Sequence, residues 1–183
     1  YEYRPSHPLK LNLNLNTPLH RARTLTHTHT HTHTLTCIQG DAIDAIAFPD
    51  AGAAKRFGKK FAAYDIITCA KVRTADNKGR VVTVAEGDPA GKNVLIVDDL
   101  VRTGGTLAEC GKALRAMGAN TVDAFCTHAV FPKLSWQRFL SGGDRAIFDK
   151  FYVTNSIPSV TSALPADDCF EVLGLESQML LDL

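Results

Sequence analysis

Two adjacent acids followed by a glycine turn form the part of this chain best suited to chemistry. Asp98 and Asp99 end an apolar run, and residues 103–106 read TGGT shortly afterwards. Glycine lets the backbone turn tightly and approach an anion closely. Backbone amides at about 102–106, where a helix is expected to begin, favour a phosphate monoester. The carboxylates then accept hydrogen bonds from neighbouring ligand hydroxyls, such as those of a ribose.

Each fragment of this segment has a plainer interpretation. Acid pairs and Thr-Gly-Gly turns also occur in ordinary strand-to-helix connections that carry an N-cap threonine. The whole string VLIVDDLVRTGGTL at 94–107 is more specific, so we favour a ligand-binding loop. It is not a Walker loop, because GDPAGKN at 87–93 has the wrong spacing and lacks a Ser or Thr after Lys92. The residues predicted to bind the ligand are Asp98, Asp99, Arg102, Thr103, Gly104, Gly105 and Thr106.

The elements that must position this loop alternate between strands and helices. Apolar patterns predict strands at 45–50, 65–72, 80–86, 93–99, 121–131, 148–156 and 170–175. Helical spacing appears over 53–61 and 107–118, and a short helix is expected at 135–140. Residues 74–79 form a polar loop that we expect to be mobile. The order predicts a mostly parallel, twisted sheet with helices on both faces.

The first 36 residues differ in kind from the rest. LNLNLN at 11–16 and THTHTHTHT at 26–34 are two-residue repeats that cannot build a varied core. We therefore expect a disordered or artefactual leader over 1–36 and one domain over 37–183. The four histidines from His27 to His33 are open to metal binding on one side of an extended chain. We favour instead a slipped nucleotide repeat that encodes alternating Thr and His.

Composition narrows the class of protein. The chain has 183 residues and a net charge of +1, which gives no general attraction to nucleic acid or to an anionic membrane. Its apolar runs are shorter than the roughly 20 residues that span a bilayer. The five cysteines are widely spread and include no C-x-x-C pair, which favours reduced, mostly buried thiols. These features predict a soluble, cytoplasmic protein.

Several segments together resemble a known family. DDLVRTGGT resembles the phosphoribosyl pyrophosphate loop of type I phosphoribosyltransferase folds, whose acid pair holds the ribose 2- and 3-hydroxyls. FPDAGAAKRF (48–57), TCAKVR (68–73) and THAVFP (127–132) resemble, in order and spacing, the C-terminal half of ribose-phosphate pyrophosphokinases of a plant-like type. The resemblance covers roughly residues 44–183. It implies a type I phosphoribosyltransferase-like α/β fold.

The resemblance also implies a reaction and roles for further residues. These enzymes transfer the diphosphoryl group of ATP to the 1-hydroxyl of ribose 5-phosphate and require Mg²⁺. Asp50 matches an acid that helps to hold magnesium, although it also suits a helix N-cap. Lys71 and Arg73 match the basic pair at the start of the catalytic loop, where their charges stabilise the transition state. From spacing alone, both cations would be solvated loop residues.

Two features depart from the family pattern. Arg102 stands where many relatives carry an acidic or neutral polar residue, so it either adds a charge-assisted bond or points to solvent. The family takes its adenine-binding residues and a magnesium-binding histidine from an N-terminal half, which residues 1–36 do not resemble. His128 is interpreted as a buried or strand-end histidine rather than a substitute catalyst.

Three functions stay open on this basis. The first is a truncated ribose-phosphate diphosphokinase whose partners are ribose 5-phosphate, ATP and other subunits, either its own copies or full-length synthetases. The second is a single-domain phosphoribosyltransferase, which would need a hood segment after residue 150. The third is a non-catalytic subunit associated with synthetases, against which Asp50, Lys71 and Arg73 argue.

Overall fold

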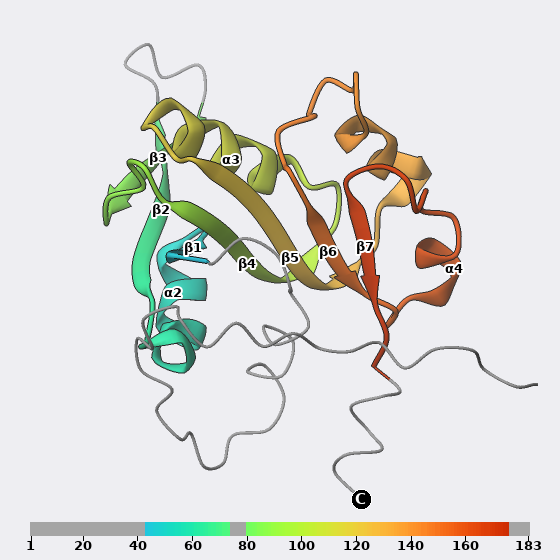
Figure 1. Ribbon diagram of the computed structural model, residues 1–183, viewed down its shortest axis with the longest axis horizontal. Coiled ribbons are helices and arrows are strands. Elements are labelled where there is room, and N and C mark those ends of the chain that lie inside the picture. The colour runs from blue at the N-terminus through green and yellow to red at the C-terminus, as the bar shows by residue number, and fades with distance from the viewer. Residues whose placement is uncertain (1–42, 74–79, 176–183) are drawn as a thin grey trace, which may run out of the picture.

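A seven-stranded sheet organises the chain in a computed structural model, which describes residues 43–73 and 80–175 (Figure 1). The strands are β1 (Ala45–Phe48), β2 (Asp65–Arg73), β3 (Arg80–Glu86), β4 (Asn93–Val101), β5 (Thr121–Ala129), β6 (Phe151–Thr154) and β7 (Phe170–Leu173). Their order in the sheet is β3-β2-β1-β4-β5-β6-β7. The pairing is parallel except between β2 and β3, which form an antiparallel edge. The predicted mostly parallel sheet is therefore confirmed.

Helices cover both faces of this sheet, as predicted. The α-helices are α2 (Ala51–Phe57), α3 (Gly105–Ala116) and α4 (Pro158–Thr161), and the 3₁₀ helices are η1 (Gly58–Phe61) and η2 (Pro132–Phe139). Figure 1 shows α3 and α2 on opposite sides of the strands. Because side chains alternate along a strand, Ile96 packs into the core beneath α3, whereas Leu95 packs into the core beside α2. Strand β4 is thus buried on both faces, as its continuous apolar run indicates.

The region between β5 and β6 differs from the sequence prediction. Strand β5 ends at Ala129 rather than at residue 131, and the predicted helix at 135–140 is a 3₁₀ element that begins at Pro132. Phe131, Lys133 and Leu134 have φ between 39° and 56°, which local propensity does not favour. Tertiary packing accounts for the conformation at Phe131, since its ring is buried and lies 5.9 Å from that of Phe139. Helix α4 was not predicted, and the predicted helical segment 53–61 is divided between α2 and the 3₁₀ helix η1.

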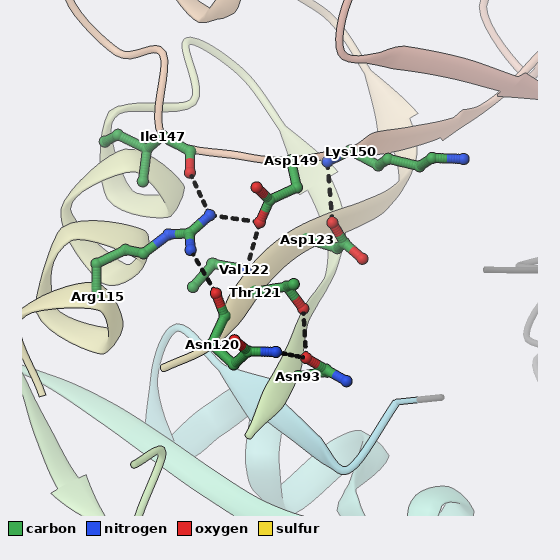
Figure 2. Close-up of polar contacts among 9 residues, drawn as sticks. All are labelled: Asn93, Arg115, Asn120, Thr121, Val122, Asp123, Ile147, Asp149 and Lys150. Atoms are coloured by element: carbon green, nitrogen blue, oxygen red, sulfur yellow. Dashed lines mark hydrogen bonds and ion pairs between the residues drawn. The ribbon is translucent and has the colours of Figure 1, made fainter. Parts of the chain in front are cut away.

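A polar network joins the C-terminal end of α3 to the amino-terminal ends of β5 and β6 (Figure 2). The Arg115 guanidinium donates to the carbonyl of Asn120 at 2.8 Å and forms an ion pair with Asp149. The Asp149 carboxylate also accepts from the amide of Val122 at 2.8 Å. The amide of Lys150 donates to the Asp123 carboxylate at 2.9 Å. These bonds satisfy backbone groups at the end of the sheet opposite the acid pair of β4.

The structure tests the prediction about the cysteines but not those about the leader and the loop at 74–79. Cys69, Cys110, Cys126 and Cys169 are free thiols, and the first three are buried, as expected. The leader at 1–36, its histidines, Cys37 and the loop at 74–79 lie outside the described residues. Among the helices of the described ranges, none has both the length and the apolar character that crossing a membrane requires.

Candidate functional site

A cavity of about 560 Å³ opens where β1 and β4 end and α2 and α3 begin. The carboxyl ends of parallel strands are where ligands bind in open α/β sheets, because the loops diverge there. Its volume is in the range of small-molecule sites. The residues that line it are Pro49, Asp50, Arg56, Lys71, Asp98, Asp99, Leu100, Val101, Arg102, Thr103, Gly104, Gly105, Thr106 and Leu107. The whole predicted binding loop therefore faces one cavity.

The glycine turn is shaped by one left-handed residue. Gly104 has φ 70° and precedes the first residue of α3. Hydrogen bonding within the helix begins with the Ala108 amide, which donates to the Gly104 carbonyl at 2.9 Å. The amides of 105–107 thus belong to the helix terminus, where donors lack acceptors inside the helix. Together with the helix dipole they favour an anion at this end of the cavity.

Two side chains from outside the loop support the turn. The Phe139 ring lies so close to Gly104 that an added Cβ would overlap it. Arg145 donates to the Thr103 carbonyl at 2.9 Å, and its guanidinium lies beside Gly105. Both residues belong to the stretch around η2, so the shape of the turn depends on this distant segment. Sequence reasoning identified neither of them.

The acid pair is held at the end of β4. Asp98 accepts from the backbone amide of Asp99 at 2.9 Å, and both side chains are partly buried. Burial, with a contribution from Asp99, raises the pKa of Asp98 to about 6. Asp99 forms an ion pair with Arg56 at 3.5 Å. Two adjacent carboxylates with one partner cation leave oxygens able to accept ligand hydroxyls or to bind a cation.

Asp50 lies directly after β1 and faces the same cavity. One carboxylate oxygen accepts from the Ala53 amide at 2.8 Å, so Asp50 is the N-cap of α2. The interpretation as an N-cap is therefore confirmed. The cap engages one oxygen of the carboxylate, and a carboxylate offers two. A metal-binding role is compatible with this geometry and stays a prediction.

The predicted catalytic cations lie on β2. The Lys71 ammonium donates to the Thr106 hydroxyl at 3.0 Å and lines the cavity. Its positive charge therefore stands at the same helix terminus that favours an anion. Arg73 is the last residue of β2, and its side chain lies outside the described part of the structure.

Three other basic residues differ in their position relative to the cavity. Arg56, in the last turn of α2, brings a second cation to the cavity. Arg102 is exposed and lines the cavity rim. His128 is exposed, hydrogen-bonds Ser156 through Nδ1 at 3.0 Å and does not line the cavity. It is therefore the strand-end histidine that the sequence suggested.

This arrangement can bind an anion next to a polyhydroxylated group. Amides, threonine hydroxyls and Lys71 provide donors at one end of the cavity. Asp98 and Asp99 provide acceptors a few residues earlier in the chain. The described residues include no cluster of three His, Cys, Asp or Glu that could hold a metal by itself.

Comparisons with known proteins found a matching family and similar sequences. Residues 51–142 match the family described as "Phosphoribosyl transferase domain". The chain is 50% identical over 133 residues to ribose-phosphate pyrophosphokinase 4 of Oryza sativa subsp. japonica, covering 71% of this chain and 40% of the relative. It is 49% identical over 132 residues to ribose-phosphate pyrophosphokinase 4 of Arabidopsis thaliana, covering 71% of this chain and 39% of the relative.

A solved structure is similar over most of this chain. The crystal structure of phosphoribosylpyrophosphate synthetase from Mycobacterium smegmatis has a TM-score of 0.60 and 26% sequence identity. The similarity covers 82% of this chain and 46% of that chain. The chain thus spans about two fifths of the length of the curated relatives that it matches.

Proposed function

Because this chain belongs to the phosphoribosyl transferase domain family, we propose that its cavity is the ribose 5-phosphate site of a ribose-phosphate diphosphokinase. The observation that carries the proposal is the meeting of the acid pair of β4 and the glycine turn in one cavity of about 560 Å³. The turn and the amino end of α3 would bind the 5-phosphate. Asp98 and Asp99 would accept from the 2- and 3-hydroxyls and so hold the 1-hydroxyl toward the open side.

Cations of the cavity fit the transfer of a diphosphoryl group. Lys71 lies within hydrogen-bonding distance of Thr106, so its charge is close to where a phosphate would sit. In the proposed reaction the 1-hydroxyl oxygen attacks the β-phosphorus of ATP and AMP leaves, which develops negative charge on the phosphoryl oxygens. Lys71 would stabilise that charge, and Arg73 is proposed to act with it. Arg56 would orient Asp99 through their ion pair.

Magnesium is the proposed cofactor, and the donor set suits it. Asp50, Asp98 and Asp99 bring hard carboxylate oxygens to one cavity, and the raised pKa of Asp98 reflects burial and neighbouring negative charge that a cation would offset. Mg²⁺ commonly binds through one or two carboxylates, substrate phosphates and water. Bound there, it would neutralise phosphoryl oxygens during transfer. Asp50 would be the main protein ligand.

Other parts of the proposal extend beyond the described residues. ATP is the proposed second substrate, and we place its adenine-binding groups in protein outside the segment that matches the curated relatives. That protein would be a longer form of the chain or another subunit. We also propose that the active form is a homo-oligomer or an assembly with full-length synthetase subunits. A cytoplasmic location is proposed with it and is supported by the four free thiols among the described residues.

A ligand-induced shift in Tm tests the central claim. Ribose 5-phosphate should raise the Tm of the chain, since ligand at about 100 times Kd stabilises by about 2.7 kcal/mol. Ribose at the same concentration should give little shift because it lacks the phosphate. An equal shift with ribose, or none with millimolar ribose 5-phosphate, would overturn the proposal.

A second assay distinguishes a diphosphokinase from a phosphoribosyltransferase. Release of pyrophosphate from phosphoribosyl pyrophosphate that depends on an added nucleobase would instead favour a phosphoribosyltransferase. Formation of phosphoribosyl pyrophosphate from ATP and ribose 5-phosphate would favour the diphosphokinase.

A further inference from the structure

Cys69 and Cys110 form an unusual pair behind the cavity. Their sulfur atoms lie 2.9 Å apart, and both side chains are fully buried. Cys69 comes from β2 and Cys110 from α3, so the pair connects elements that are 41 residues apart in sequence. A disulfide requires about 2.05 Å between sulfurs. The two sulfurs would therefore have to approach each other by about 0.9 Å to form the bond.

The backbone places this pair in register with the cavity. Lys71 follows Cys69 by two residues on the same face of β2, a rise of about 6.6 Å. Thr106 precedes Cys110 by four residues on the same face of α3, a rise of about 6 Å. The sulfur pair and the Lys71–Thr106 hydrogen bond are thus two successive connections between one strand and one helix.

We propose that Cys69 and Cys110 are a redox-modification site, in which a peroxide oxidises the two thiols to an intramolecular disulfide that fastens β2 to α3. The Cys110 thiol donates to the sulfur of Cys69, and this hydrogen bond lowers the pKa of Cys69, so Cys69 is the first nucleophile. The fully buried pair admits only a small oxidant, and we name hydrogen peroxide.

The reaction balances in two steps. The Cys69 thiolate attacks one oxygen of hydrogen peroxide, the O–O bond breaks, and a sulfenic acid forms with release of water. The Cys110 sulfur then attacks the sulfenic sulfur, so that an S–S bond forms and the S–O bond breaks. The two thiol protons leave in the two waters, and the two electrons reduce the peroxide.

Peptide mapping of the full chain tests the proposal directly. Trypsin releases Cys69 in residues 61–71 and Cys110 in residues 103–112, each with a single cysteine. After folded protein is treated with hydrogen peroxide, we expect these two peptides to be joined and to lose two hydrogens. The Tm should rise on the order of 5 °C or more, because the link closes a long loop. Dithiothreitol should reverse both changes.

Matched variants identify the pair. C110A should abolish the link and the Tm shift, whereas C126A, which removes another buried thiol, should keep both. Because the link is mapped in the unaltered chain, a variant that fails to fold leaves the main test intact. Oxidation that joins other cysteines, or that joins Cys69 to Cys110 only after unfolding in urea, would overturn the proposal.

Discussion

The Lys71 ammonium donates a 3.0 Å hydrogen bond to the hydroxyl of Thr106, which joins strand β2 to the first turn of α3 at the cavity. The contact is exposed, so it contributes less than about 1 kcal/mol to folding. We infer that its main effect is to place a positive charge beside the helix terminus.

Replacement of Lys71 by methionine tests this inference. Lys71→Met should change Tm by less than about 4 °C, and it should weaken the binding of inorganic pyrophosphate at least fivefold by calorimetry, because one charged donor is lost. Lys112→Met, which removes an exposed lysine from α3 outside the cavity, is the matched control. Equal affinity in Lys71→Met and the unaltered chain would contradict the assignment.

Neutralising Asp98 should weaken ligand binding without lowering the stability of the fold. Asp98→Asn should weaken ribose 5-phosphate binding at least tenfold, because the amide loses the charge that strengthens hydrogen bonds from sugar hydroxyls. Since the carboxylate is partly buried, the variant should be at least as stable as the unaltered chain at pH 8. Asp88→Asn, in a surface turn, is the control for calorimetry and thermal unfolding. Undiminished affinity in Asp98→Asn would count against the sugar-binding role.

Two left-handed glycines provide a matched pair for the turn. Gly91→Ala, where φ is 69° and no atom lies within 4 Å of the added Cβ, should cost about 1–2 kcal/mol for backbone strain alone. Gly104→Ala should cost at least about 1 kcal/mol more, because its methyl group also overlaps Phe139. Urea unfolding gives both free energies. Similar losses in the two variants would show that Phe139 does not constrain the turn.

A pH dependence follows from Asp123, in the network of Figure 2. Burial raises the pKa of Asp123 to about 6, above its usual value of 3.8. Between about pH 4 and pH 6 the folded state binds more protons than the unfolded state, so this residue's contribution to stability falls as pH rises. Asp123→Asn should therefore be more stable than the unaltered chain by about 1 kcal/mol at pH 8, after allowance for solvent screening.

The same comparison at low pH provides the control. Asparagine can still accept the 2.9 Å hydrogen bond from the Lys150 amide. The difference in unfolding free energy between Asp123→Asn and the unaltered chain should vanish near pH 4, where Asp123 is protonated in the folded state. A constant difference across the pH range would indicate a cause other than ionisation.

Much of the fold was predictable because its signal is local. Strand β4 reads as an unbroken apolar run, and the structure buries it on both faces, with Leu95 and Ile96 in different cores. Element η2 was not predictable in this way. Its residues Lys133 and Leu134 have positive φ values, and they lie between Phe131 and Phe139, whose rings are 5.9 Å apart in the folded chain.

The site likewise contains residues that local sequence predicts and residues that it does not. Residues 98–106 are contiguous, so their types and order alone indicate a ligand-binding loop. Arg145 reaches this loop from 42 residues away, and Arg56 reaches Asp99 from another helix. As isolated surface cations both look solvated, because a single sequence carries no distance information. The 2.9 Å approach of Cys69 and Cys110 was hidden for the same reason.

The contact between Gly104 and Phe139 affects whether the loop could keep its shape in another protein. A designer who copied residues 94–107 onto another α/β scaffold would leave behind the ring that packs against Gly104 and the guanidinium that holds the Thr103 carbonyl. The transplanted segment would keep its motif and lose its shape. The unit that must be inherited or grafted intact therefore runs from β4 through Arg145, about four times the length of the motif that a pattern search detects.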